Sequence, residues 1–276
     1  PDSLRYLIAN LLAKPKLAAV FGKFRTINRH RNLLTSFINI ETLSFQFLIQ
    51  AGRYLLFKIA ILPGTNFVIR RDILEACGCW DTEALTEDTE LSIRIYQKGF
   101  EIKFVPYAVT WEQEPEKWGT WLRQRTRWVR GNFYVLRKFL LPSFRFGNWA
   151  LTFELVHLFM LYYAFILSIL TSHFFFLVCG VGWLAVFLPW TYFSVWVCSF
   201  ILFITEITLA LYFEEEATPR NFGVTILMYF TYTQAWIVLV FRAIYQEYIL
   251  GGRIKWEKTR RFAATPVNDH LNLPDE

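Results

Sequence analysis

The sequence contains no lysine or arginine between Phe146 and Pro219, although its 276 residues include 29 of them and carry a formal net charge of +6. Basic charge is therefore confined to the first half and the last quarter of the chain. A nucleic-acid-binding surface needs many basic side chains along it, whereas basic flanks around an apolar region are typical of membrane proteins. We expect membrane lipids, and no nucleic acid, among the partners.

Cysteine is also scarce, since the chain has four: Cys77, Cys79, Cys179 and Cys198. The spacing Cys77-Gly78-Cys79 is too tight for a usual zinc pair, and no set of histidines or further cysteines accompanies it. We expect four unpaired thiols that pack as small hydrophobic side chains.

What the sequence has in abundance is apolar surface: it is 54% hydrophobic and 19% aromatic. Four apolar runs follow residue 148, and each has close to the ~20 residues that a bilayer helix needs: Trp149–Leu170, Phe174–Trp190, Phe193–Phe213 and Phe222–Phe241. With four spans, the basic flanks before and after them both face the cytoplasm. We expect an all-α transmembrane region over 149–245 and a cytoplasmic tail over 246–276, in a multi-pass protein of the plasma membrane.

Residues 1–148 alternate helical and strand patterns, which indicates an α/β domain. The predicted helices are Pro1–Ala13, Asn32–Lys58, Asp72–Ala76, Thr86–Lys98 and one from Pro115 towards Lys138. The predicted strands are Leu17–Phe21, Phe67–Ile69, Ile102–Val105 and Ala108–Trp111.

The triplet Thr86-Glu87-Asp88 opens one of these helices, with Thr86 in the N-cap position. One interpretation is structural, because acidic residues in a first helical turn stabilise the helix dipole. The other is catalytic, because a carboxylate fixed at a helix start can act as a general base towards an attacking hydroxyl group.

The run from Gln124 to Trp128 also allows two interpretations. On a helix, Gln124, Arg127 and Trp128 share a face. A guanidinium matches phosphate oxygens and an indole ring can stack on a sugar, so this face suits a ligand with a diphosphate and a sugar. The alternative is a basic, aromatic helix lying under lipid headgroups.

Taken together, the order Pro63-Gly64-Thr65, Thr86-Glu87-Asp88 and Gln124-x-x-Arg127-Trp128 before an apolar region resembles processive family 2 membrane glycosyltransferases. These are the synthases of cellulose, hyaluronan and poly-N-acetylglucosamine. The resemblance implies a partial GT-A-type domain over 1–148 and an inverting enzyme. It would add sugar from a nucleotide-sugar donor, expected to be a UDP-sugar, to a growing β-linked polysaccharide.

The resemblance also implies roles for individual residues. Asp88 corresponds to the catalytic base, and Thr86 and Glu87 belong to its triplet. The later motif holds the nucleotide diphosphate and the acceptor sugar, and in this chain it is formed by Gln124, Arg127 and Trp128. Gly64 and Thr65 correspond to a turn near the acceptor terminus.

The family's Asp-x-Asp motif, which holds Mg²⁺ or Mn²⁺ on the sugar nucleotide, occurs nowhere in this sequence. It would precede Pro1. We therefore expect the intact enzyme to use Mg²⁺ or Mn²⁺, no metal site within this chain, and no activity from residues 1–276 alone.

Two other functions remain open on the sequence. One is a non-processive transferase that acts on a lipid-linked acceptor. The other is a non-catalytic membrane scaffold or transporter whose basic helix binds lipid phosphates, although such a protein has no need of both motifs.

Overall fold

The computed structural model describes residues 2–145, 147–164, 167, 170, 171, 174 and 189–251. Its first half confirms the α/β prediction. Three strands form a mixed sheet in the order β2-β1-β3, with β1 (Leu17–Thr26) in the middle. Strand β1 is antiparallel to β2 (Phe67–Ile69) and parallel to β3 (Glu101–Glu112).

Two short strands were predicted where the structure has only β3, so that part of the prediction is wrong. The chain stays extended through Pro106 because the register shifts there: Gly22 of β1 pairs with Val105, and the next residue, Lys23, pairs with Val109. A bulge of this kind removes the need for ladder hydrogen bonds at proline.

Gly22 permits this irregularity. A Cβ atom on Gly22 would collide with the carbonyl oxygen of Ala108 and with the amide nitrogen of Asn66. The Asn66 amide instead donates to Lys23 O at 2.9 Å and to Ala108 O at 2.8 Å, and so joins all three strands at this point.

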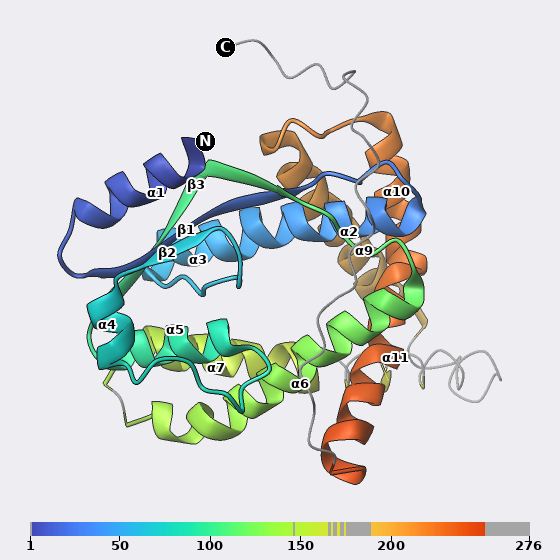
Figure 1. Cartoon of the computed structure of the whole chain (residues 1–276). Coiled ribbons are helices and arrows are strands. Elements are labelled where there is room, and N and C mark those ends of the chain that lie inside the picture. The colour runs from blue at the N-terminus through green and yellow to red at the C-terminus, as the bar shows by residue number, and fades with distance from the viewer. Residues whose placement is uncertain are drawn as a thin grey trace.

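Helices cover both faces of the sheet (Figure 1). On one face, α1 (Asp2–Leu12) packs through Leu7 and Leu11. The helices that follow along the chain are α2 (Leu33–Ser44), the π-helical segment η1 (Phe45–Ala51), α3 (Gly52–Phe57), α4 (Arg71–Ala76), α5 (Glu87–Gln97), α6 (Trp118–Ser143), α7 (Trp149–Phe159) and η2 (Met160–Ala164).

The predicted helix Asn32–Lys58 is confirmed as α2, η1 and α3 in succession. It starts at Asn32 because the side chain of Asn32 accepts a bond from the Thr35 N–H and the Thr35 hydroxyl bonds back to Asn32, which is a capping box. It ends where Lys58 adopts a left-handed conformation, with φ of 56°.

Two apolar cores meet along α6. The first joins the sheet to α5, to α7 and to the C-terminal half of α6. The second joins α2 and α6 to α9 (Pro189–Phe213), α10 (Pro219–Phe230) and α11 (Tyr232–Ile244), after which the π-helical segment η3 (Tyr245–Ile249) follows. Helix α6 therefore sets the position of the C-terminal helices relative to the sheet.

In the described part of the chain, no helix by itself combines the length and the apolar content needed to cross a bilayer. The pair formed by α10 and Tyr232–Ile249 does so only jointly, and a bend of 42° separates its two halves. The predicted run Phe222–Phe241 is thus broken at Thr231. Most of the predicted run Phe174–Trp190 and the tail from residue 252 lie outside the described residues, and the four-span region stays a prediction, as does the domain division.

Cysteine burial differs from the expectation. Cys77, Cys79 and Cys198 are free thiols as predicted, but only Cys77 is buried, whereas Cys79 and Cys198 are exposed. Cys79 follows α4 in a left-handed conformation, with φ of 57°. Cys179 lies outside the described residues.

The contact between Gly22 and Asn66 gives a testable prediction. Gly22→Ala should lower the free energy of unfolding by about 1–3 kcal/mol, because its methyl group overpacks the bulge between β1 and β3. Thermal unfolding of the purified protein measures this. Gly223→Ala is the matched control, since a Cβ there meets nothing within 4 Å and should stabilise α10 by up to about 1 kcal/mol. Equal effects of the two variants would refute the close contact at Gly22.

Candidate functional site

The triplet Thr86-Glu87-Asp88 lies at the start of α5 with Thr86 in the N-cap position, as predicted, but the Thr86 side chain does not bond to the helix. Its φ and ψ are −121° and 68°, and its side chain makes no capping hydrogen bond. The Thr86 hydroxyl is buried and has no hydrogen-bond partner among the described residues. A helix of another part of the chain lies against Thr86.

That helix is α6, and Gly131 is its point of contact. A Cβ on Gly131 would lie 2.6 Å from both Thr86 Oγ1 and Thr86 Cγ2 and 2.8 Å from the Thr86 nitrogen. Only glycine lets the backbone of α6 approach the first turn of α5 this closely. The packing brings the two predicted motifs, one at each helix, into one region.

The turn at Gly64 reaches the same region from the other side. Gly64 has φ of +74°, a conformation that favours glycine, and a Cβ on it would lie 2.7 Å from Asp88 Oδ2. Its neighbour Thr65 donates a hydrogen bond to the carboxylate of Glu112 on β3. The structure therefore places Gly64 directly against the Asp88 carboxylate.

Burial raises the pKa of Asp88 to about 6. A hydrogen bond of 2.7 Å from the Thr89 N–H to Asp88 Oδ1 opposes this shift, the charge of Glu87 adds to it, and the guanidinium of Arg127 opposes it. A carboxylate with a pKa near the working pH is effective as a general base, because it is ionised and still has an appreciable affinity for a proton.

Arg127 extends from α6 to the start of α5. Its Nη1 donates to Leu85 O at 3.0 Å, while its buried Nε has no partner among the described residues. Burial lowers the pKa of Arg127, and the charges of Glu87 and Asp88 act against that shift. Gln124, one turn earlier, has a buried Oε1 that is also unpartnered in the described chain. Buried polar atoms usually have a partner, so these two are the unsatisfied groups of the motif.

Trp128 is held by Arg125, which the sequence analysis did not single out. The Arg125 guanidinium lies 3.9 Å from the centroid of the Trp128 ring. Arg125 is buried, and its Nη2 lies 2.6 Å from Glu41 Oε2 on α2. The same oxygen accepts a bond of 2.9 Å from the hydroxyl of Tyr232 on α11, and the Trp121 indole donates to that hydroxyl at 2.8 Å.

Burial lowers the pKa of Arg125, but the charges of Glu41, Tyr232 and Glu114 and the hydrogen bond to Glu41 together outweigh burial and hold the pKa above its usual value. Arg125 is therefore charged at every relevant pH. No hydrogen bond or ion pair joins Gln124 or Trp128 directly to Asp88 within the described residues.

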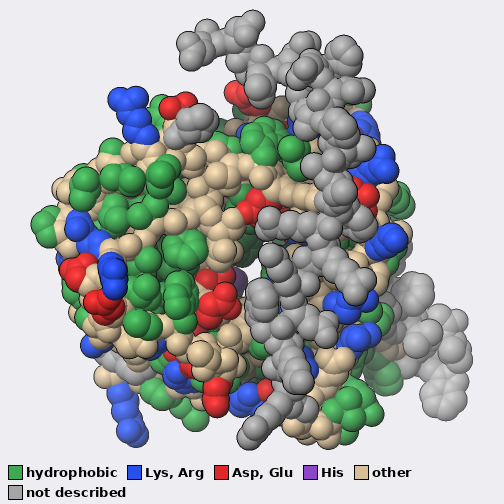
Figure 2. Space-filling model, in the orientation of Figure 1, with side chains coloured by type: hydrophobic (Ala, Val, Ile, Leu, Met, Phe, Trp, Pro, Cys, Tyr) green, Lys and Arg blue, Asp and Glu red, His purple; other side chains and the backbone are tan. Residues whose placement is uncertain are grey.

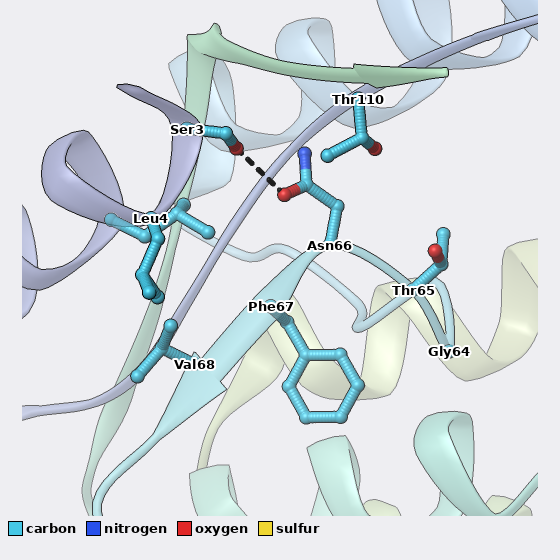
Figure 3. A pocket seen from close by; sticks show the side chains of 9 residues that line it. Ser3, Leu4, Gly64, Thr65, Asn66, Phe67, Val68 and Thr110 are labelled. Atoms are coloured by element: carbon cyan, nitrogen blue, oxygen red, sulfur yellow. Dashed lines mark hydrogen bonds between the residues drawn. The ribbon is translucent and has the colours of Figure 1, made fainter. Parts of the chain in front are cut away.

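An open pocket lies beside the Gly64 turn (Figure 3). It is lined by Ser3, Leu4 and Leu7 of α1, by Gly64–Val68 and by Thr110. Ser3 Oγ donates to Asn66 Oδ1 at 2.9 Å, and the Thr110 hydroxyl is buried without a partner in the described chain. On the face of the molecule seen in Figure 2, acidic side chains gather beside a hollow near the centre.

The described residues contain no group of three or more His, Cys, Asp or Glu side chains that could hold a metal ion. The side chains near Asp88 thus do not fit Mg²⁺ or Mn²⁺ as ligands, and nothing in the chemistry below depends on a metal held by them.

Sequence comparison groups this chain with known proteins. Residues 1–213 match the family described as glycosyl transferase family group 2. The probable glycosyltransferase YdaM of Bacillus subtilis is 47% identical over 268 residues, which cover 93% of this chain and 62% of that protein. The poly-beta-1,6-N-acetyl-D-glucosamine synthase of Staphylococcus aureus is 32% identical over 156 residues, which cover 55% of this chain and 38% of that protein. The chain thus spans less than two thirds of the length of either relative.

A comparison of structures finds the mannosyltransferase PcManGT from Pyrobaculum calidifontis in complex with GDP-Man and Mn²⁺. The similarity has a TM-score of 0.47 at 17% identity, and it covers 90% of this chain and 58% of that one.

The packing of Gly131 on Thr86 is testable. Gly131→Ala should lower the free energy of unfolding by about 1–3 kcal/mol, because the added methyl group forces α6 away from α5. Gly119→Ala, in the same helix, is the control: its Cβ would meet only Arg123 Nη1, at 3.8 Å, so it should be neutral or stabilising by up to about 1 kcal/mol. Thermal unfolding compares the two, and a smaller loss for Gly131→Ala than for Gly119→Ala would exclude the proposed contact.

Proposed function

Because the chain belongs to glycosyl transferase family group 2, we propose that it carries the base and part of the donor and acceptor site of a GT-A-type membrane glycosyltransferase. The observation that carries the proposal is the convergence of the Asp88 carboxylate, the Gly64 turn and Arg127 at the start of α5. The enzyme would transfer a hexose from a nucleotide sugar, with inversion, to a growing β-linked polysaccharide.

In this mechanism Asp88 takes the proton from the acceptor hydroxyl as its oxygen forms a bond to the anomeric carbon. The bond from that carbon to the diphosphate breaks, and the nucleoside diphosphate leaves. The free Nε of Arg127 suits a phosphate oxygen, and the free Oε1 of Gln124 suits a sugar hydroxyl. Trp128, with its ring held under Arg125, offers a stacking surface for the acceptor.

The polymer acceptor is supported by the similarity to the staphylococcal poly-N-acetylglucosamine synthase, and the membrane location by the bent apolar pair of α10 and Tyr232–Ile249. A direct assay uses membranes from cells that express the complete gene, incubated with Mg²⁺ or Mn²⁺ and one labelled donor at a time. UDP-glucose, UDP-N-acetylglucosamine, UDP-glucuronate and GDP-mannose form the panel.

We expect label from one donor in ethanol-insoluble polysaccharide. Label that is extracted by organic solvent would instead indicate transfer to a lipid-linked acceptor. Absence of transfer from all four donors, with the protein present in the membranes, would contradict the proposed activity for these donors and favour a scaffold or transporter.

The base is tested separately. Asp88→Asn should lower kcat by about 10²–10⁴-fold, because the amide cannot accept the acceptor proton. Asp72→Asn is the matched control, since Asp72 is an exposed acid in the first turn of α4, and its activity should stay close to wild type. Near-normal turnover of Asp88→Asn would rule out the assignment.

The pKa of Asp88 predicts the pH dependence. The base works only when ionised, so kcat/KM should fall as the pH drops through about 6, the value that burial gives Asp88, and not through the lower range of an exposed aspartate. A pH profile of kcat/KM measures this. An apparent pKa below 5 for the acidic limb of the profile would exclude Asp88 as the titrating group.

A further inference from the structure

The connection between α9 and α10, residues Glu214–Thr218, is bound to the sheet. Glu214 Oε2 lies 2.6 Å from Lys23 Nζ and 2.8 Å from Arg25 Nη2, and Arg25 also donates to Glu214 O at 3.2 Å. Glu216 Oε1 lies 3.2 Å from Arg29 Nε. The two basic partners of Glu214 belong to the central strand, β1, of the sheet.

These contacts are partly shielded from water. Only 7% of the Glu214 side chain and 11% of the Glu216 side chain are exposed. Ion pairs buried to this extent hold only when both partners stay in place, because an unpaired buried charge is costly. The connection is therefore fixed against the sheet-bearing domain.

Because the connection Glu214–Thr218 is fixed to the sheet, it must lie on the same side of a membrane as the sheet. The hydrocarbon core of a bilayer is about 30 Å thick, whereas the charged atoms of Glu214 and Lys23 lie 2.6 Å apart. Four successive crossings with both basic flanks on one side would put this connection on the opposite side from the sheet. The ion pairs exclude that arrangement.

The helices after the connection also remain on the domain. At their junction, Tyr232 is buried between Trp121 of α6 and Glu41 of α2. Beyond it, α11 packs into the second core through Leu239, Val240 and Ala243. In Figure 1, α10 and α11 lie at one end of the molecule and α11 crosses α6.

The opposite face of α11 and η3 is apolar and exposed. Its residues recur every three or four positions and so form one stripe, which we call the α11 stripe: Val238, Phe241, Tyr245 and Ile249. Arg242 is exposed beside it. A helix with an aromatic and aliphatic stripe next to a basic side chain is typical of segments that lie in the membrane interface.

We propose that α10, α11 and η3 lie along the membrane surface on the side of the sheet, and that the α11 stripe is their contact with the boundary between lipid headgroups and acyl chains. The run Phe222–Phe241 then does not cross the bilayer. The bend of 42° between its halves lets the pair follow both the domain and the membrane surface. This proposal concerns placement and holds for any donor or acceptor.

Cysteine labelling tests the placement in membranes that contain the complete protein. In a background without native cysteines, Ala217→Cys reports on the connection and Arg242→Cys on the end of the run. Glu83→Cys, in an exposed loop before α5, reports on the domain. Inside-out and right-side-out vesicles are treated with a membrane-impermeant maleimide, and detergent-solubilised samples define full labelling.

We expect all three cysteines to be labelled in the same vesicle orientation and protected in the other. Labelling of Arg242→Cys and Ala217→Cys in opposite orientations would show a crossing and overturn the proposal. Labelling of Ala217→Cys opposite to Glu83→Cys would show that the ion pairs do not form in the membrane, which also overturns it.

The lipid contact is tested with a fluorophore on Val238→Cys in reconstituted vesicles with spin-labelled lipids. Quenching should be stronger with a spin label near the headgroup than with one near the end of the acyl chain. Stronger quenching by the deep label would indicate a crossing helix, and absence of quenching by both would indicate that protein covers the α11 stripe. Either result refutes the lipid contact, and neither depends on transferase activity.

Discussion

The position of α6 depends on the ion pair between Arg125 and Glu41. Arg125 is almost wholly buried, and removal of Glu41 would leave its charge uncompensated in the core. The Tyr232 hydroxyl binds the same carboxylate oxygen, so α2, α6 and α11 are joined at a single point. Since the Arg125 guanidinium also lies on the Trp128 ring, the group that fixes the helix also orients a candidate binding residue.

The candidate site is then assembled where backbones approach one another. Gly131 lets α6 reach Thr86, and Gly64 lets a turn reach Asp88. Burial of Asp88 in this region is the main cause of its raised pKa. Gln124 and Arg127 contribute buried polar atoms without partners in the described chain. Tight backbone packing and unsatisfied polar groups thus occur together at the start of α5.

Much of this arrangement could be predicted from local sequence. Helix periodicity predicts the long helix before Lys58, and local motifs single out Gly64, Asp88 and Arg127, which the structure brings together. Their catalytic roles remain predictions. Contacts between distant segments could not be predicted, because neither Glu214 beside Lys23 nor Tyr232 beside Glu41 has a periodic signal. The contact of Gly131 did have a local signal in the sequence, since an isolated glycine inside a helix often marks close packing.

The fit between Gly22 and Asn66 has a consequence for sequence divergence. The amide of Asn66 occupies the volume that a side chain on Gly22 would need, and its two bonds to Lys23 O and Ala108 O replace ladder bonds lost at the bulge. A smaller residue at 66 would not admit a side chain at 22, because a Cβ there also meets the backbone carbonyl of Ala108. Position 22 should therefore stay glycine among relatives that keep this pairing of β1 with β3, whereas a change at 66 alone would detach the turn beside Asp88 from the sheet.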